Sequence, residues 1–140
     1  HRLEHTLVIN NVEFVNDSKA TNIKSVIVAI ETFKKPTILI LGGYNKGTDF
    51  RLLLPHIKSS HVRDVVSYGE AGGHINTALG DAVRLVQVTN LKSAVNKAHT
   101  LAVPGDIVLL SPGCASFDEF NNYEERGKFF KKLVSNLAKK

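Results

Sequence analysis

Hydrophobic residues recur along the chain in two periods, one typical of strands and one typical of helices. An alternation over residues 7–14 surrounds the pair Asn10-Asn11, and two short strands about such a turn form a β-hairpin. Apolar residues at helical spacing follow over residues 22–33. Pro36 ends that helix. The nearly continuous apolar run over residues 37–41 then predicts a strand buried on both faces.

The same alternation of helix and strand continues through the rest of the chain. Helices are predicted at 52–57, 70–79 and 91–103, strands at 62–68, 83–88 and 107–111, and a terminal helix after a loop from 112 to about 123. Strands that alternate with helices form a mostly parallel sheet that is covered on both faces. The sequence therefore predicts one α/β domain over residues 1–140. Its fold is a doubly wound, Rossmann-like sheet of about six mostly parallel strands, with one antiparallel strand from the N-terminal hairpin.

Composition narrows the class of protein. Of the 140 residues, 43% are hydrophobic and 22% are charged, which is typical of a soluble globular domain. The single cysteine, Cys114, excludes an internal disulfide and suits a reducing compartment, so we expect a cytoplasmic location. We also expect a monomer. No apolar run approaches the roughly 18 residues of a membrane span, so no membrane partner is expected. The chain has no methionine, and we expect it to be a piece of a longer protein.

The net charge of +5 is concentrated at one end of the chain. Residues 124–140 hold six basic and two acidic side chains, whereas the preceding 123 residues hold 12 basic and 11 acidic ones. The same segment carries an apolar stripe at helical spacing, from Phe129 to Leu137. We interpret it as a terminal helix with solvated lysines and expect no nucleic-acid partner, because such binding needs a wider basic surface.

Three polar loops follow predicted strands: the first loop (residues 16–22), the second loop (42–49) and the third loop (111–118). Ligands of open α/β sheets gather beyond the carboxyl ends of such strands, but the sequence does not show whether these strands are neighbours. In the first loop, Thr21 or Asn22 caps a helix beside Lys19, which indicates either an anion site or ordinary capping. In the second loop, a glycine pair precedes Lys46, which indicates either a ligand contact or a tight turn.

The third loop offers nucleophiles but no base to activate them. Ser111, Cys114 and Ser116 lie there without a Gly-x-Ser-x-Gly motif. We interpret Cys114 as a packed side chain. The six histidines lack metal-ligand spacing, and no P-loop motif is present. The residues alone thus indicate a domain that binds a small anion, with neither a metal site nor a nucleotide cradle of its own.

Taken together, the motifs have the order and spacing of one known family. They are Asn16-Asp17-Ser18-Lys19-Ala20-Thr21-Asn22, Gly42-Gly43 with Lys46, and Ser111-Pro112 with Cys114-Ala115-Ser116-Phe117-Asp118. In these motifs the chain resembles the C-terminal domain of the bacterial Mur ligases over essentially its whole length. The Asp-Ser-Lys-Ala-Thr-Asn and Ser-Pro-x-Cys-Ala-Ser strings are similar to those of the family member that adds D-glutamate.

The resemblance implies an ATP-dependent step of peptidoglycan precursor synthesis. The carboxylate of UDP-N-acetylmuramoyl-L-alanine is phosphorylated to an acyl phosphate, which the amine of D-glutamate then attacks. In this family the ATP phosphates, Mg²⁺ and the UDP group are bound mainly by other domains, and the C-terminal domain brings D-glutamate. We therefore expect this chain to hold no catalytic residue, to bind D-glutamate weakly and to be inactive alone.

The resemblance also implies roles for individual residues. The D-glutamate positions are Thr21, Lys46, Ser116, Phe117 and Tyr123. The nucleotide-side positions are His1, Arg2, Asp17 and Lys19. An ammonium and hydroxyl donors suit a dicarboxylate, because charge-assisted hydrogen bonds are strong. Two positions depart from the usual family pattern, with Tyr123 in place of phenylalanine and Gly113 in place of alanine.

Two other interpretations of the sequence remain open. One is a stand-alone Rossmann-like module that uses the same loops to bind a small anion or a protein partner. The other is a sister ligase that adds a different amino acid. Stereospecific binding of D-glutamate would separate the leading hypothesis from both.

Overall fold

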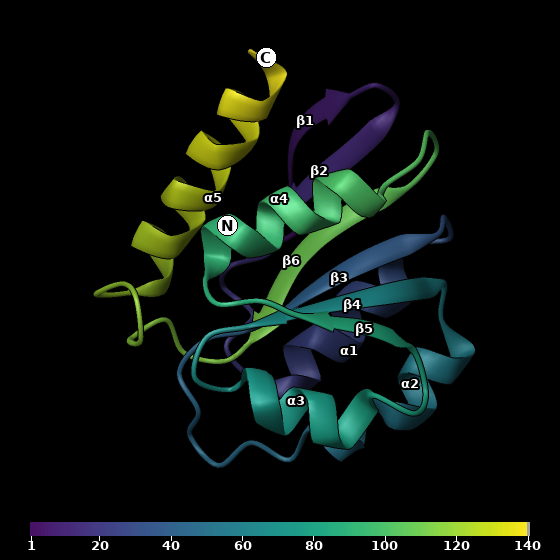
Figure 1. Ribbon diagram of the computed structural model, residues 1–140, viewed down its shortest axis with the longest axis vertical. Helices are drawn as coiled ribbons and strands as arrows, with labels where there is room; N and C mark the ends of the chain where they lie inside the picture. The colour runs from purple at the N-terminus through teal and green to yellow at the C-terminus, as the bar shows by residue number, and fades with distance from the viewer. Residues whose placement is uncertain (140) are drawn as a thin grey trace.

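The computed structural model describes residues 1–139. It contains a six-stranded sheet in the order β1-β2-β6-β3-β4-β5, in which every pair is parallel except β1 with β2 (Figure 1). The strands are β1 Glu4–Ile9, β2 Val12–Asn16, β3 Thr37–Gly42, β4 Val62–Tyr68, β5 Arg84–Gln87 and β6 Ile107–Gly113. The prediction of a doubly wound sheet with one antiparallel hairpin strand is confirmed.

Helices cover both faces of the sheet. They are α1 Ile23–Thr32, η1 Phe50–Leu53, α2 Leu54–Ser59, α3 Gly72–Leu79, α4 Leu91–Leu101 and α5 Tyr123–Ala138. Helices α1, α2 and α3 pack on one face, and α4 and α5 pack on the other (Figure 1). The alternate residues of β3 divide between the two cores, Leu39 and Leu41 in one and Ile38 and Ile40 in the other. This division explains why the strand reads as a continuous apolar run.

Local signals define the hairpin and the helix starts. Asn10 and Asn11 both have positive φ, 51° and 62°, as a two-residue hairpin turn of the mirror-image type requires. Asn22, the side chain that caps α1, accepts a hydrogen bond from the Ser25 N–H at 3.0 Å. The sequence left this cap open between Thr21 and Asn22, and the structure selects Asn22.

Several element boundaries differ from the predicted ones, and two of these differences concern the loops. Helix α3 begins at Gly72 and not at residue 70, because residues 69–71 turn over the second loop, where the Ala71 N–H donates to the Gly43 carbonyl at 3.0 Å. Strand β6 continues to Gly113, because that residue still pairs with Gly42 of β3. Both differences lie where strands reach the loops.

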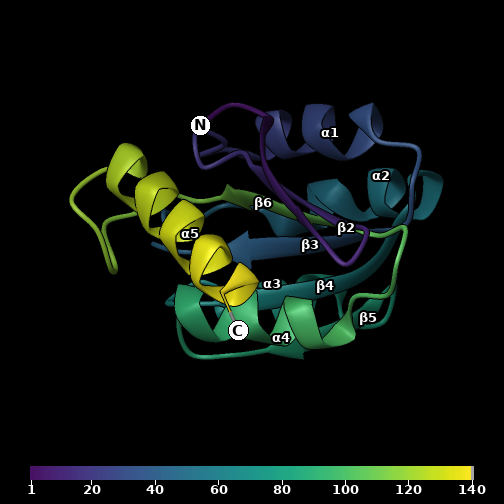
Figure 2. The same cartoon turned by 90° about the horizontal axis from the view of Figure 1, so that it is seen from above.

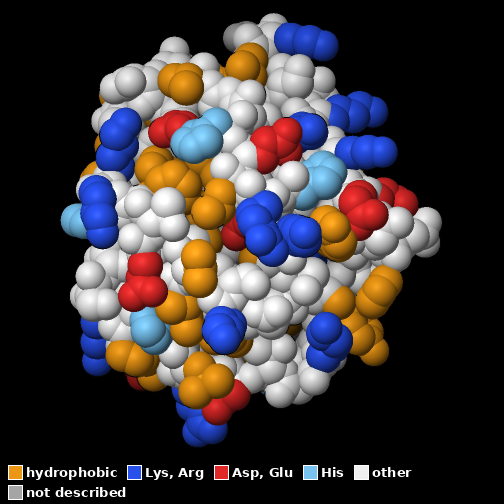
Figure 3. All heavy atoms as spheres, turned by 180° about the vertical axis from the view of Figure 1, so that it is seen from behind, with side chains coloured by type: hydrophobic (Ala, Val, Ile, Leu, Met, Phe, Trp, Pro, Cys, Tyr) orange, Lys and Arg blue, Asp and Glu red, His pale blue; other side chains and the backbone are white. Residues whose placement is uncertain are grey.

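The first residues of the chain lie against the first loop, as Figure 2 shows from above. The Lys19 N–H donates to the His1 carbonyl at 3.1 Å. On the face turned away in Figure 1, lysine and arginine side chains are interspersed with acidic and apolar ones (Figure 3). Within residues 1–139, no helix is both long and apolar enough to span a membrane.

Candidate functional site

The three polar loops meet at the carboxyl edge of the sheet. Strand β6 lies between β2 and β3, so the loops that follow these strands are neighbours. The Asp17 N–H donates to the Leu110 carbonyl and the Gly113 N–H to the Ala20 carbonyl, both at 2.8 Å, which joins the first loop to the end of β6 and the third loop. The Tyr44 N–H donates to the Ala115 carbonyl at 2.9 Å, which joins the second loop to the third.

Asp17 fastens the first loop to the chain start and to the third loop. One of its carboxylate oxygens accepts the Leu3 N–H at 3.0 Å, and the other accepts the Ser111 hydroxyl at 2.9 Å. Burial raises the pKa of Asp17, against the opposing effect of these two hydrogen bonds. Ser111 is thereby engaged as a donor to the Asp17 carboxylate, which joins the end of β6 to the first loop.

Arg126 is the most deeply buried charged group at this edge, with no exposed surface. Its guanidinium donates to the Ser18 hydroxyl at 2.9 Å, to the Ser18 carbonyl at 2.7 Å and to the Cys114 carbonyl at 2.9 Å. Sequence reasoning placed Arg126 among the basic residues of the terminal helix and among the residues that carry the family resemblance, but gave it no role at the site. A signal was present, because Arg126 lies four residues before the buried Phe130 and eight before the buried Val134, in phase with the buried face.

The second loop presents Lys46 at the surface. The Asn45 N–H donates to the Glu70 carboxylate, and the Gly47 N–H donates to the Asn45 side-chain oxygen, both at 3.0 Å. These bonds hold the backbone on both sides of Lys46, whose side chain is exposed. Glu70 is a second residue that sequence reasoning missed, since nothing in its spacing relates it to the loop.

The five D-glutamate positions implied by the resemblance lie on these loops and at the start of α5. Ser116 is buried, Thr21 and Tyr123 are half-buried, and Lys46 and Phe117 are exposed. The Phe117 ring packs edge-on against Tyr44 of the second loop, with ring centroids 6.3 Å apart. Among residues 1–139 no hydrogen bond joins the side chains of Thr21, Lys46 and Ser116 to one another, which leaves their polar groups available to a ligand.

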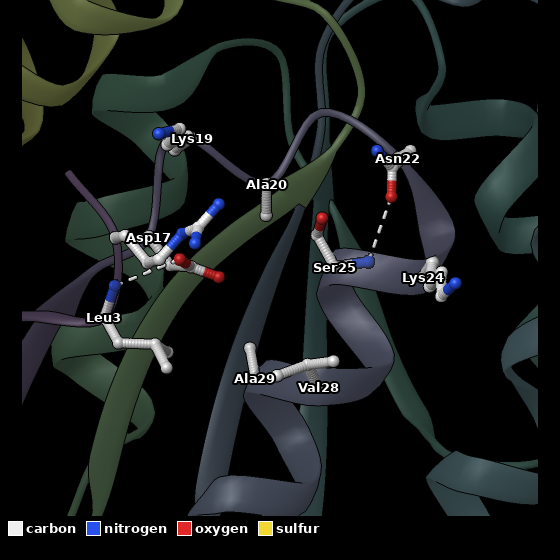
Figure 4. A pocket seen from close by; sticks show the side chains of 10 residues that line it. Leu3, Asp17, Lys19, Ala20, Asn22, Lys24, Ser25, Val28 and Ala29 are labelled. Atoms are coloured by element: carbon white, nitrogen blue, oxygen red, sulfur yellow. Dashed lines mark hydrogen bonds between the residues drawn. The ribbon is translucent and has the colours of Figure 1, made fainter.

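A pocket of about 320 Å³ opens beside the first turn of α1 (Figure 4). Its lining includes three cationic side chains and one carboxylate, from Arg2, Lys19, Lys24 and Asp17. The positive end of the α1 dipole lies at the same place, which favours anions. Three of the four nucleotide-side positions, Arg2, Asp17 and Lys19, thus share one pocket.

The fourth nucleotide-side position, His1, lies between the β2 end of the sheet and α5. Its ring nitrogen Nδ1 is 2.9 Å from the Asn16 amide, and its ring packs edge-on against Tyr123 at 6.3 Å between centroids. The ring occupies the space that a side chain at position 127 would fill, since a Cβ on Gly127 would overlap it. Gly127 is therefore the residue that admits His1 against α5.

Replacing Gly127 with alanine is expected to displace the His1 ring. A glycine inside a helix ordinarily costs roughly 0.5–1 kcal/mol relative to alanine, and Gly73→Ala in α3 should gain up to that amount because a Cβ there meets no atom within 4 Å. In Gly127→Ala the gain is offset by loss of the His1 packing. Thermal unfolding and the NMR signals of the His1 and Tyr123 rings measure both effects. Equal stabilisation of the two variants, with unchanged ring signals, would contradict this role of Gly127.

The third loop holds no activated nucleophile. Cys114 is fully buried, and burial raises its pKa to about 12, so the thiol stays protonated at neutral pH. Its interpretation as a packed side chain is confirmed. Within the part of the chain that the structure describes, no three His, Cys, Asp or Glu side chains gather as a metal site.

Comparison with known proteins identifies relatives of the chain. The family model described as "Mur ligase, glutamate ligase domain" matches residues 1–114. Two proteins named UDP-N-acetylmuramoylalanine–D-glutamate ligase are similar, one from Chlamydia caviae (45% identity over 137 residues) and one from Salinibacter ruber (44% over 138 residues). Both matches cover 98% of this chain, but 32% and 30% of the respective relatives, so the chain spans about a third of their length.

The fold also matches a solved structure of a murein peptide ligase from Psychrobacter arcticus. The TM-score is 0.66 at 11% sequence identity. The match covers 96% of this chain and 30% of that one. At this identity the likeness shows the shared fold alone.

Proposed function

The chain belongs to the Mur ligase, glutamate ligase domain family, and from this premise we propose that it is the C-terminal, D-glutamate-binding domain of a peptidoglycan precursor ligase. The observation that supports the proposal is the meeting of the three loops at one edge of the sheet, because these loops and the start of α5 carry the positions that the resemblance assigns to D-glutamate. The relatives at about 45% identity are named for ligation of D-glutamate, which supports this amino acid over others.

The proposed reaction forms one amide bond at the expense of ATP. The γ-phosphate of ATP passes to the carboxylate of UDP-N-acetylmuramoyl-L-alanine and gives an acyl phosphate and ADP. The amine of D-glutamate attacks the acyl carbon, and phosphate leaves. Within residues 1–139 no three His, Cys, Asp or Glu side chains gather as a metal site. We propose, as the resemblance implies, that Mg²⁺ is held mainly by other domains, and no step is assigned to that ion in this chain.

In this reaction the chain positions D-glutamate. The Lys46 ammonium and the hydroxyls of Thr21 and Ser116 bind its two carboxylates through charge-assisted hydrogen bonds. Phe117, through its backbone, and Tyr123 line the same pocket. Holding the amine against the acyl phosphate supplies the rate enhancement that orientation gives.

The pocket beside α1 is proposed to take part of the nucleotide. Arg2 and Lys19 carry the charge that phosphate oxygens require, and the Asp17 carboxylate suits ribose hydroxyls. His1 precedes Arg2 in the chain and contacts the first loop, because its carbonyl accepts the Lys19 N–H. The chain has no glycine-rich phosphate loop. The resemblance implies that other domains of the ligase make the main contacts to the nucleotide and hold the UDP group.

The isolated chain should bind D-glutamate only weakly. Three charge-assisted contacts contribute roughly 1.5–3 kcal/mol each, whereas association costs at least about 4 kcal/mol. The difference, on the order of 1–5 kcal/mol, corresponds to millimolar affinity or weaker. The chain alone should also not hydrolyse ATP, because the resemblance implies that the ATP phosphates are bound mainly by another domain.

An NMR titration with D-glutamate, repeated with L-glutamate, tests the proposal. The amide signals of Thr21, Lys46 and Ser116 should shift, and more for the D isomer. Lys46→Met removes the ammonium and should weaken binding roughly 10- to 150-fold, since a hydrogen bond to a charged group contributes about 1.5–3 kcal/mol. The matched control is Lys58→Met, which removes an exposed lysine on α2 and should leave the titration unchanged. Equal shifts with both isomers, or no effect of Lys46→Met, would refute the assignment.

A further inference from the structure

Arg126 carries a buried positive charge that no carboxylate neutralises directly. Its side chain is 0% exposed, and none of the ion pairs formed by residues 1–139 includes it. Buried arginines are ordinarily paired. Here Nε, Nη1 and Nη2 each donate one hydrogen bond, together to one hydroxyl and two carbonyl groups of the neighbouring loops.

The groups around Arg126 belong to all three loops. Ser18 lies in the first loop and Cys114 in the third, and both accept its N–H groups. The backbone of Gly43 in the second loop approaches so closely that a Cβ there would lie 3.3 Å from Nη1. The Ser18 hydroxyl also donates to the Tyr123 carbonyl at 2.7 Å, which connects the first loop to the start of α5.

Each proposed D-glutamate contact lies a few residues from one of these anchor points. Thr21 is three residues after Ser18, Lys46 is three after Gly43, and Ser116 is two after Cys114. A shift of the guanidinium would therefore change the spacing between the three ligand groups. Because Arg126 has no exposed surface, it cannot itself touch a ligand.

We propose that Arg126 is the positioning residue of this site, which fixes the three loops at the spacing that a dicarboxylate requires. The inference rests on the proposed function for the identity of the ligand. The mutual placement of the loops rests on the contacts alone, so it can be tested without any ligand.

We call the hydrogen bonds of Arg126 to Ser18 and Cys114 the clamp. Two variants weaken the clamp to different degrees. Arg126→Lys keeps the charge but loses the planar fork of donors, and Ser18→Ala removes one acceptor and leaves the arginine in place. The control is Arg63→Lys, in which a half-buried arginine that donates to Asp64 and to the Leu101 carbonyl is altered near the other edge of the sheet. All three variants should lower the thermal midpoint, which makes stability alone uninformative.

Hydrogen exchange of the loop amides measures how firmly the clamp holds the loops together in the absence of ligand. The amides of Asp17, Gly113 and Tyr44 form the backbone bonds between the loops. In Arg126→Lys they should exchange about tenfold faster than in the native chain. The amides of β3 should remain the most slowly exchanging ones, in the same order as in the native chain. Ser18→Ala should give a smaller change in the same direction, and Arg63→Lys should leave the three loop amides unchanged relative to β3.

The D-glutamate titration gives the second readout. Its affinity should fall about tenfold in Arg126→Lys and stay unchanged in Arg63→Lys, because a displaced loop loses a charge-assisted contact. If the amides of Asp17, Gly113 and Tyr44 exchange in both clamp variants at the rates of the native chain, the proposed role of Arg126 is wrong, whichever ligand the site binds. Absence of any D-glutamate shift in the native chain, with accelerated loop exchange in the variants, would instead contradict the ligand of the proposed function and support the clamp.

Discussion

Replacing Gly42 with alanine is expected to cost about 3 kcal/mol or more of the free energy of unfolding. Gly42 has a φ of +152°, which L side chains rarely adopt. A Cβ there would overlap the Tyr68 carbonyl oxygen and lie 2.7 Å from its ring carbon Cδ1. Neither group can move, because Tyr68 is fully buried and pairs with Gly42 in the β3–β4 ladder. Backbone strain and overpacking therefore add.

A second glycine of the same loop is the matched control. Gly47 also has positive φ, +79°, but a Cβ there would meet no atom within 4 Å. Gly47→Ala should thus lose only the cost of the left-handed backbone, about 1–2 kcal/mol. Urea unfolding of both variants separates strain from overlap. If the two variants lose the same stability, the close approach of β3 to Tyr68 does not limit residue 42.

The elements of this fold are local properties of the sequence, and most could be predicted. Ile38 to Leu41 are apolar in succession because both faces of β3 are covered. The turn at Asn10-Asn11 follows from side chains that tolerate positive φ. The order of the strands in the sheet is not a local property and could not be predicted in this way. That β6 lies between β2 and β3 depends on pairing between residues about 95 positions apart in the chain, and no local period records it.

The candidate site divides in the same way. The loops that carry Thr21, Lys46 and Ser116 stand out by themselves, because polar and glycine residues follow apolar strands. The residues that hold the loops together do not stand out in the sequence. Arg126 looks like one more basic residue of a basic helix until its burial is known, and Glu70 lies 24 residues from the lysine whose loop it supports. Such supporting residues act across the fold, so composition and spacing do not reveal them.

Near the amino edge of the sheet, Asp64→Asn is expected to cost about 2 kcal/mol at neutral pH. Asp64 is 1% exposed and is bound by Arg84 and Arg63, which both approach its carboxylate. Hydrogen bonds from Arg84 and then Arg63 lower the pKa of Asp64. Breaking a buried pair costs about 3–5 kcal/mol, and the figure here is smaller because Arg84 is 64% exposed and regains water.

The pH dependence of this loss follows from the direction of the shift. A carboxylate whose pKa is lowered by folding stabilises the native state above its ordinary pKa of about 3.9, and this stability is lost as the pH falls through the lower native value. The difference between the native chain and Asp64→Asn in urea unfolding should therefore be largest near pH 7 and shrink below about pH 4. A difference that stays constant down to pH 3 would contradict an ionised, arginine-bound Asp64.

Asp49→Asn tests whether burial, and not the presence of an arginine, produces the effect. Asp49 also bonds to an arginine, Arg51, which lowers its pKa, but both side chains are exposed. Water and salt screen such a pair, so its loss should change the unfolding midpoint far less than Asp64→Asn does at every pH. Because Asp64 lies away from the three loops, Asp64→Asn should also retain the D-glutamate response of the native chain wherever it is folded. Stability and ligand binding would then be separable at the two edges of one sheet.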